Sequence, residues 1–160
     1  EEKVGKAFYS VATGLERARA HTAARSIGQA QGALEQAIAY AKERRQFKKP
    51  IAEFQAIRFK IATMATEIEA ARQLMYHVCH LIDQGQRSDK EAAMVKYFAA
   101  EMAERVTSEA LQILGGAGFT TLYPVERYWR DARLSKIFEG TSEIQQRIIS
   151  DHLLGKAEGV

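Results

Sequence analysis

The sequence predicts an all-α protein, an up-down four-helix bundle with additional short C-terminal helices. Long stretches repeat apolar residues every three or four positions, and no convincing strand alternation appears, apart from a possible short extended piece at the N-terminus. The only two prolines, Pro50 and Pro124, lie outside the periodic stretches. With 160 residues, 46% of them hydrophobic and 27% charged, the chain suits one globular domain with a sizeable core.

The composition argues against several classes of function. The net charge of +3 is mild, and a solvated helix end explains the densest basic run, residues 42–49, so no nucleic-acid partner is predicted. No apolar run approaches membrane-spanning length, and no signal peptide is visible. The single cysteine, Cys79, excludes an internal disulfide and is best interpreted as a core thiol. His77 and His80 share a helix face that Cys79 does not, so no metal site is expected.

The first helix is expected from about Ser10 to Arg45, after a linker formed by residues 1–9. Its apolar stripe consists of Leu15, Ala18, Ile27, Ala30, Leu34, Ile38 and Ala41. Small residues are frequent in this helix and would let another helix or a ligand approach closely. A run of cations and then Pro50 predict where the helix stops.

The second helix has the clearest periodicity and is expected to end near Gly85. Its heptad-like seam consists of Ile57, Ile61, Met64, Ile68, Ala71, Met75, Val78 and Ile82. Ser88 and Glu91 have the spacing of a capping box and predict the start of the third helix. The buried stripe of that helix consists of Val95, Phe98, Met102, Val106, Ala110 and Ile113. The glycines of residues 115–118 predict its end, and a short helix is expected after Tyr123-Pro124.

A carboxylate precedes the last predicted helix. Ser142 and Gln145 have capping-box spacing, which predicts that this helix begins at Ser142. Glu139 lies just before it, on a loop that Gly140 allows to turn tightly. A carboxylate fixed there beside the apolar pair Ile137-Phe138 could serve as a catalytic base. From this stretch alone, a surface Glu before a helix start is the commoner interpretation.

A basic segment joins the first two predicted helices. Arg44, Arg45 and Gln46 end the first helix and are followed by Phe47, and Phe54-Gln55 opens the second. The planar fork of an arginine suits phosphate oxygens, and a glutamine offers both a donor and an acceptor. On the charge pattern alone, an exposed basic turn is the preferred alternative.

Two further polar features are candidates for binding. The stretch Gln112 to Gly116 places adjacent glycines at a helix end, where the backbone can approach a ligand closely. A simple helix cap is the alternative, although one cap does not need three glycines. Glu16 and Arg19 share one face of the first helix, where an exposed salt bridge is the default interpretation.

These motifs, in this order, resemble the C-terminal helical domain of acyl-CoA dehydrogenases. The resemblance runs from Gly5 to His152, and one departure is Lys48, where the family often has glycine. The motifs are Leu15-Glu16-x-x-Arg19, Glu43-Arg44-x-x-Phe47, Phe54-Gln55, Gln112-Ile113-Leu114-Gly115-Gly116-x-Gly118-Phe119, Tyr123-Pro124-Val125-Glu126-Arg127, Arg130-Asp131 and Phe138-Glu139-Gly140-Thr141.

The resemblance implies a flavoprotein that uses FAD to oxidise acyl-CoA thioesters to trans-2-enoyl-CoA. It implies that Glu139 is the base that removes the α-proton. Some family members carry this base on the first long helix, at a position that Ala18 occupies here, so the later position is implied. In the family, an N-terminal helical domain and a middle β domain precede this one and form much of the flavin and acyl-CoA pocket.

The resemblance also assigns binding residues. The implied FAD contacts are Arg44, Arg45, Gln46, Phe47, Phe54, Gln55, Gln112, Ile113, Leu114, Gly115, Gly116, Thr141, Ser142 and Glu143. The implied acyl-CoA contacts are Glu16, Arg19 and Gly140. Residues 44–46 are expected to meet the FAD phosphates from a neighbouring subunit, and residues 112–116 the ADP part across a dimer.

The implied partners are an acyl-CoA, an electron-transfer flavoprotein or similar acceptor, and further copies of the chain in a dimer or tetramer. The implied location is the cytoplasm for a bacterial protein, which is favoured, or the mitochondrial matrix for a eukaryotic one. A non-catalytic oligomerisation bundle is the alternative function. The small-residue face of the first helix and the heptad-like second helix motivate it.

Overall fold

The structure, a computed structural model, describes the backbone of residues 7–156 and the side chains of residues 14–156. The predicted linker therefore lies largely outside the described residues, and the first helix already begins at Ala7. The elements in chain order are α1 (Ala7–Glu43), β1 (Arg45–Gln46), β2 (Lys49–Pro50), η1 (Ile51–Glu53), α2 (Gln55–Asp83), α3 (Asp89–Leu114), η2 (Gly115–Phe119), α4 (Val125–Ser135) and α5 (Ser142–Leu154).

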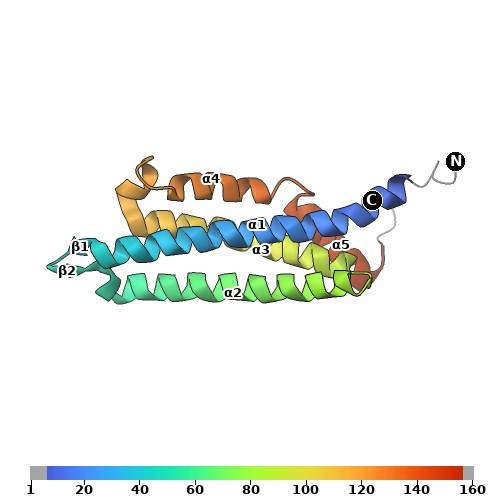
Figure 1. Cartoon of the computed structure of the whole chain (residues 1–160), viewed down its shortest axis with the longest axis horizontal. Helices are drawn as coiled ribbons and strands as arrows, with labels where there is room; N and C mark the ends of the chain where they lie inside the picture. The colour runs from blue at the N-terminus through green and yellow to red at the C-terminus, as the bar shows by residue number, and fades with distance from the viewer. Residues whose placement is uncertain (1–6, 157–160) are drawn as a thin grey trace.

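The four helices α1 to α4 run alternately up and down, which confirms the predicted bundle (Figure 1). α1 and α3 run in the same direction and pack against each other, while α2 and α4 lie on opposite sides of this central pair. α5 packs against α3 near the end where α3 begins. Within residues 7–156, no helix is long and apolar enough to cross a membrane.

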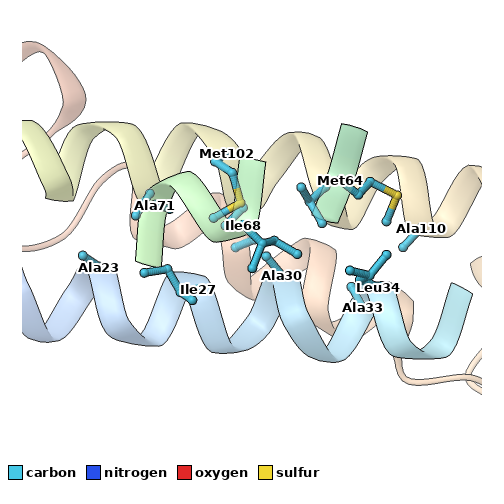
Figure 2. Close-up of a cluster of buried hydrophobic side chains, with 14 of the residues drawn as sticks. Ala23, Ile27, Ala30, Ala33, Leu34, Met64, Ile68, Ala71, Met102 and Ala110 are labelled. Carbon is cyan, nitrogen blue, oxygen red and sulfur yellow. The ribbon is translucent and has the colours of Figure 1, made fainter. Parts of the chain in front are cut away.

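Alanines allow α1 and α3 to lie close together. Small side chains keep two helix backbones near each other, while larger residues fill the space beside the contact. In Figure 2, Ile68 of α2 and Met102 of α3 point toward the alanine face of α1. The alanines of α1 and α3 that are completely buried are Ala23, Ala30, Ala33, Ala37, Ala41, Ala92, Ala93, Ala99, Ala100, Ala103 and Ala110.

The predicted apolar stripes face the core, except at the start of α1, where Leu15 is 37% exposed. On α3 the whole predicted stripe is buried except for Phe98, which is partly buried against the core. On α2 only Met64, Ile68, Ala71 and Val78 are fully buried, because this helix covers the central pair from one side. The remaining seam residues of α2 are partly buried.

The segment after α1 differs from the prediction. α1 ends at Glu43 rather than Arg45, and β1 and β2 form an antiparallel hairpin that the sequence analysis missed. The two turn residues, Phe47 and Lys48, have φ angles of 50° and 70°. A two-residue hairpin turn of this kind needs positive φ at both positions and usually carries Asn-Gly, so Phe-Lys gives no recognisable turn signal.

Candidate active site

The loop between α4 and α5 holds Glu139 in an unusual backbone conformation. Glu139 has a φ of 56° and Gly140 a φ of 93°, both in the left-handed region. A Cβ atom on Gly140 would lie 2.6 Å from Nε2 of Gln145. The loop therefore requires glycine at position 140 and turns sharply at Glu139.

The start of α5 corrects the predicted capping box. The N-cap residue is Thr141, whose hydroxyl accepts a hydrogen bond from the backbone N–H of Ile144 at 3.4 Å. Ser142 instead donates to Oε1 of Glu101 on α3 at 2.8 Å, because it is buried against that helix. Gln145 donates to the carbonyl of Gly140 at 2.9 Å and so reaches the loop rather than a cap N–H.

A cavity of about 610 Å³ lies between this loop and α1. Its lining consists of Arg17, Ala18, His21, Thr22, Arg25, Phe138 and Glu139. Ala18 and Glu139 thus face the same space, although they are distant in sequence. The guanidinium of Arg25 lies 4.2 Å from the centre of the Phe138 ring, a favourable cation–π contact.

Phe138 lines the cavity beside Glu139, but the described residues do not bury Glu139 in the expected apolar surroundings. The Glu139 side chain is exposed, Ile137 is 52% exposed, and cationic residues of α1 share the cavity. General-base chemistry at a carboxylate is favoured by burial away from water. The burial that general-base chemistry needs must therefore come from outside the described residues.

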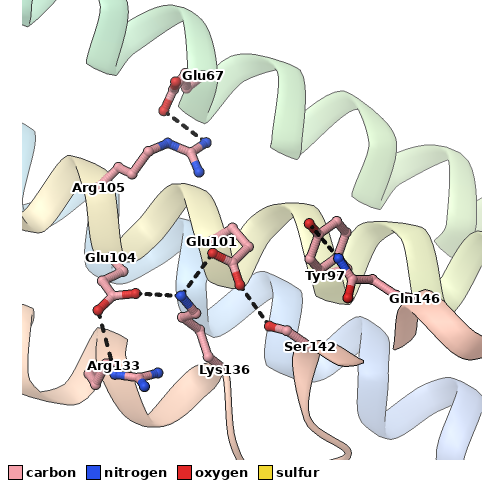
Figure 3. A network of polar contacts seen from close by, with 9 residues as sticks. All are labelled: Glu67, Tyr97, Glu101, Glu104, Arg105, Arg133, Lys136, Ser142 and Gln146. Atoms are coloured by element: carbon pink, nitrogen blue, oxygen red, sulfur yellow. Dashed lines mark hydrogen bonds and ion pairs between the residues drawn. The ribbon is translucent and has the colours of Figure 1, made fainter. Parts of the chain in front are cut away.

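A network of charges ties α4 and the following loop to α3 (Figure 3). The amino group of Lys136 lies 2.8 Å from Oε2 of Glu101 and 2.8 Å from Oε2 of Glu104. Hydrogen bonds with these two carboxylates raise the pKa of Lys136. Glu101 also accepts the hydrogen bond from Ser142, so the network reaches both sides of the loop that carries Glu139.

Glu16 and Arg19 do not form the expected exposed salt bridge. Arg19 is only 9% exposed, and its Nε has no hydrogen-bond partner among the described residues. Burial, followed by a hydrogen bond with Asp89, raises the pKa of the Glu16 carboxyl group. Arg19 lines a hollow of about 330 Å³ with Arg87, Asp89, Ile148, Asp151, His152 and Lys156. The hollow is therefore lined by side chains of both charge signs.

The predicted cofactor segments at the other end of the bundle are mostly exposed. Phe47 is 87% exposed and makes an edge-on contact with Phe54 at 6.1 Å between ring centres. Arg45 donates to the carbonyl of Lys48 at 2.9 Å, which holds the hairpin. Arg44, Gln46 and Gln55 are exposed, as are Gln112, Gly115 and Gly116. Ile113 and Leu114 are core residues, so their side chains are not available to a ligand.

The predicted site residues therefore fall into two groups. Glu139 to Glu143, Glu16 and Arg19 lie near one end of the bundle, and residues 44–55 and 112–116 lie near the other (Figure 1). α1 is continuous from Ala18 to Glu43, and at 1.5 Å per residue this stretch is about 38 Å long. The structure does not bring the two groups together within one chain.

The sequence analysis missed several residues beside Glu139. His21, Thr22 and Arg25 follow Ala18 along one side of α1, and that helical spacing could have identified them. Lys96 was also missed, although a lysine with alanines three and four residues away on both sides is a recognisable signal of burial.

The fold and the site together define an all-α bundle domain that carries an acid–base candidate at one end and a cationic hairpin at the other. The model of the acyl-CoA dehydrogenase C-terminal domain matches residues 5–154. The chain belongs to the acyl-CoA dehydrogenase family and corresponds to its C-terminal domain.

Individual relatives agree with this assignment. The chain is 47% identical over 152 residues to 3-(aryl)acrylate reductase of Clostridium sporogenes, covering 95% of this chain and 40% of that protein. It is 49% identical over 154 residues to the caffeyl-CoA reductase-Etf complex subunit CarC of Acetobacterium woodii, covering 96% of this chain and 41% of that subunit. The structure of butyryl-CoA dehydrogenase from Megasphaera elsdenii superposes with a TM-score of 0.87 at 44% identity. The match covers 88% of this chain and 37% of that enzyme. The chain thus spans about two fifths of the length of these relatives.

Proposed function

We propose that this domain supplies the catalytic base of an FAD-dependent enzyme that oxidises acyl-CoA thioesters to trans-2-enoyl-CoA. The observation that carries the proposal is the placement of Glu139, on a sharply turned loop beside a cavity that it shares with Ala18 of α1. Family members carry the base at one or the other of these two positions, and both positions line the same cavity here. The family membership of the chain supports the same reaction.

The proposed role of Glu139 is to take the α-proton of the thioester. Bound FAD would supply the acceptor for the β-hydrogen, which leaves as a hydride while the α,β double bond forms. The α C–H bond is weakly acidic, and a carboxylate shielded from water is a stronger base than one in water. Because Glu139 is exposed in this chain, substrate and the rest of the enzyme must close the cavity over it.

The donor chemistry of the hairpin end fits a dinucleotide cofactor. Arg44 and Arg45 offer forked cationic donors for phosphate, and Phe47 offers an exposed ring. The exposed backbone at Gly115 and Gly116 has open space around it, which allows close approach of a ligand. Ile113 and Leu114 would contribute only backbone groups.

We propose that FAD is held between two subunits. The hairpin end and the Glu139 end are separated by most of α1, about 38 Å at the rise of an α-helix. A single chain would therefore give one flavin either the hairpin or the base, whereas two chains side by side in opposite orientations would give it both. This arrangement supports a homo-oligomer, a dimer or a tetramer.

The remaining assignments concern substrate and acceptor. The charged hollow lined by Arg19 supports acyl-CoA binding near Glu16 and Arg19, with Gly140 beside the reacting carbons. An electron-transfer flavoprotein is the proposed acceptor, in line with the name of the Acetobacterium woodii relative. A cytoplasmic location in a bacterium, or the mitochondrial matrix in a eukaryote, is proposed with it. The alternative is that the domain only assembles subunits.

Replacing Glu139 by glutamine in the full-length flavoprotein tests the proposal. Glu139→Gln keeps the size of the side chain but removes the base, so substrate-driven flavin reduction should fall by about 10²–10⁴-fold. The flavin content should stay at the wild-type level. Glu35→Gln, on the exposed face of α1, is the matched control and should reduce at the wild-type rate. Normal flavin reduction in Glu139→Gln would refute the assignment and favour the assembly role.

A further inference from the structure

Among the side chains that the structure describes, Lys96 is the largest that is completely buried. It lies on α3 between Ala92 and Ala93 on one side and Ala99 and Ala100 on the other, all of them fully buried. A lysine rarely occupies such a site, because the burial of its amino group must be balanced by hydrogen bonds. An apolar side chain of similar length, such as methionine, would fill this space without that cost.

The amino group of Lys96 contacts the loop that carries Glu139. Its Nζ donates to the carbonyl oxygen of Gly140 at 2.6 Å. Nε2 of Gln145, which is also completely buried, donates to the same oxygen at 2.9 Å and to the carbonyl of Glu139 at 3.4 Å. Two buried donors from α3 and α5 therefore converge on one peptide group of the loop.

This peptide group lies in the part of the loop that most needs support. Glu139 is not a glycine, and its φ of 56° is a conformation that costs roughly 1–3 kcal/mol unless the surroundings maintain it. The backbone N–H of Ser142 closes the turn by donating to the carbonyl of Lys136 at 3.0 Å. That bond spans the turn but does not orient the peptide groups within it. Lys96 and Gln145 hold the Gly140–Thr141 peptide through the Gly140 carbonyl, and Gln145 also contacts the carbonyl of the Glu139–Gly140 peptide.

The charges around Lys96 agree with this contact. Burial lowers the pKa of Lys96, and nearby Arg19 lowers it further, whereas Glu101, Glu139 and Glu143 oppose the shift. The charge of Glu139 is thus among those that affect the pKa of Lys96. A buried amino group held in this balance binds the loop carbonyl in a nearly fixed direction, since it has no water to exchange with.

We propose that Lys96, together with Gln145, is a positioning residue that holds the Glu139–Gly140 turn so that the Glu139 carboxylate faces the cavity beside α1. The functional half of this inference rests on the proposed role of Glu139 as a base. Lys96 lines neither the cavity nor the hollow at Arg19, so it acts through the backbone of the loop.

The test uses Lys96→Met and Lys96→Arg in the full-length flavoprotein. Methionine keeps the length of the side chain and removes the donor, so kcat for flavin reduction should fall by about 10–100-fold, because a base displaced by about 1 Å loses this much. KM should change less than kcat, within about twofold, because the Gly140 carbonyl is already occupied by Lys96 and Gln145. Arginine keeps a donor and should recover part of the loss. Lys60→Met, which removes a half-exposed partner of Glu109, is the matched control.

Amide hydrogen exchange gives a readout that is independent of activity. In Lys96→Met, exchange should speed up at residues 139–142 while the amides of α2 keep their wild-type rates. A kcat and an exchange pattern equal to those of Lys60→Met would overturn the proposal. If Lys96→Met does not fold, Gln145→Met is read in the same way. For Gln145→Met, a fall of kcat smaller than that expected for Lys96→Met, together with faster exchange at residues 139–142, supports the proposal. Wild-type kcat and exchange in Gln145→Met overturn it.

The two proposals fail separately. Normal turnover in Glu139→Gln would reject Glu139 as the base. The exchange result would still show whether Lys96 supports the turn. Wild-type exchange in Lys96→Met, combined with an inactive Glu139→Gln, would retain the base and reject Lys96 as its support.

Discussion

The conformation of Gly140 makes a strong and quantitative prediction about stability. Gly140→Ala adds one methyl group at a φ of 93°, where an L-residue is strained. The new Cβ would lie 2.6 Å from Nε2 of Gln145, so that amide must move away from the carbonyl it contacts. Because Gln145 is completely buried, its displaced N–H groups would find no water.

The expected loss is the sum of two effects. The left-handed conformation of a non-glycine residue costs about 1–2 kcal/mol. A buried amide that loses its acceptor costs a further ~1–2 kcal/mol. Gly140→Ala should therefore reduce the free energy of unfolding by about 2–4 kcal/mol, and Tm should fall by roughly 2–4 °C for each kcal/mol in a chain of this size.

Urea and thermal unfolding of the 160-residue chain, followed by helical circular dichroism, measure this loss. Gly28→Ala is the matched control, since Gly28 lies on an exposed face of α1 with nothing within 4 Å of the added Cβ. Alanine there should raise stability by about 0.5–1 kcal/mol, because it is the better helix former. The reasoning is refuted if Gly140→Ala is as stable as Gly28→Ala.

Two further predictions concern the hairpin and the charge network. Lys48→Gly should stabilise the chain by roughly 0.5–1 kcal/mol in urea unfolding, because Lys48 has a φ of 70° that glycine adopts without strain; a destabilised variant would show that the lysine side chain supports the turn. The Lys136 network should stabilise the fold most at intermediate pH. The pKa of Lys136 is raised above 10.5, so its contribution is present below that value and is lost as the pH rises through the raised pKa. Burial alone would raise the pKa of Glu101, but hydrogen bonds from Lys136 and Ser142 lower it below 4.5, so its contribution is lost as the pH falls through the lowered value. Lys136→Met should flatten both limbs of a plot of Tm against pH, and an unchanged plot would contradict this view of the network in Figure 3.

The helix caps show how far local sequence rules reach. Ser142 and Gln145 have the spacing of a capping box, yet Thr141 caps α5, although Ile144 follows it at the position where a capping box has Glu or Gln. Glu101, far away in sequence, accepts a hydrogen bond from Ser142. Ser142 therefore contacts α3, and Thr141 caps the helix. Ser88 behaves similarly: it precedes α3 as predicted, but its hydroxyl donates to Glu16 on α1 rather than to its own helix.

The glycines near the end of α3 show why one pattern can have several causes. Gly115 has a positive φ of 60° and ends the helix, as the sequence predicts. A Cβ on Gly118 would lie 2.8 Å from Cβ of Leu114 and 2.9 Å from the carbonyl of Leu111, so this glycine is needed for packing. Gly116, like Gly115, has open space around it, so a ligand could approach its backbone.

The sequence by itself determined the helices, their order and the family, because apolar periodicity, glycine stops and motif order are local properties of the chain. It also singled out Glu139 as the acid–base candidate. Only the tertiary structure decided that Glu139 shares a cavity with Ala18, and that Lys96 contacts Gly140. The physical reason is that these contacts join residues on different helices, and their geometry depends on how closely the alanine faces of α1 and α3 allow the bundle to pack.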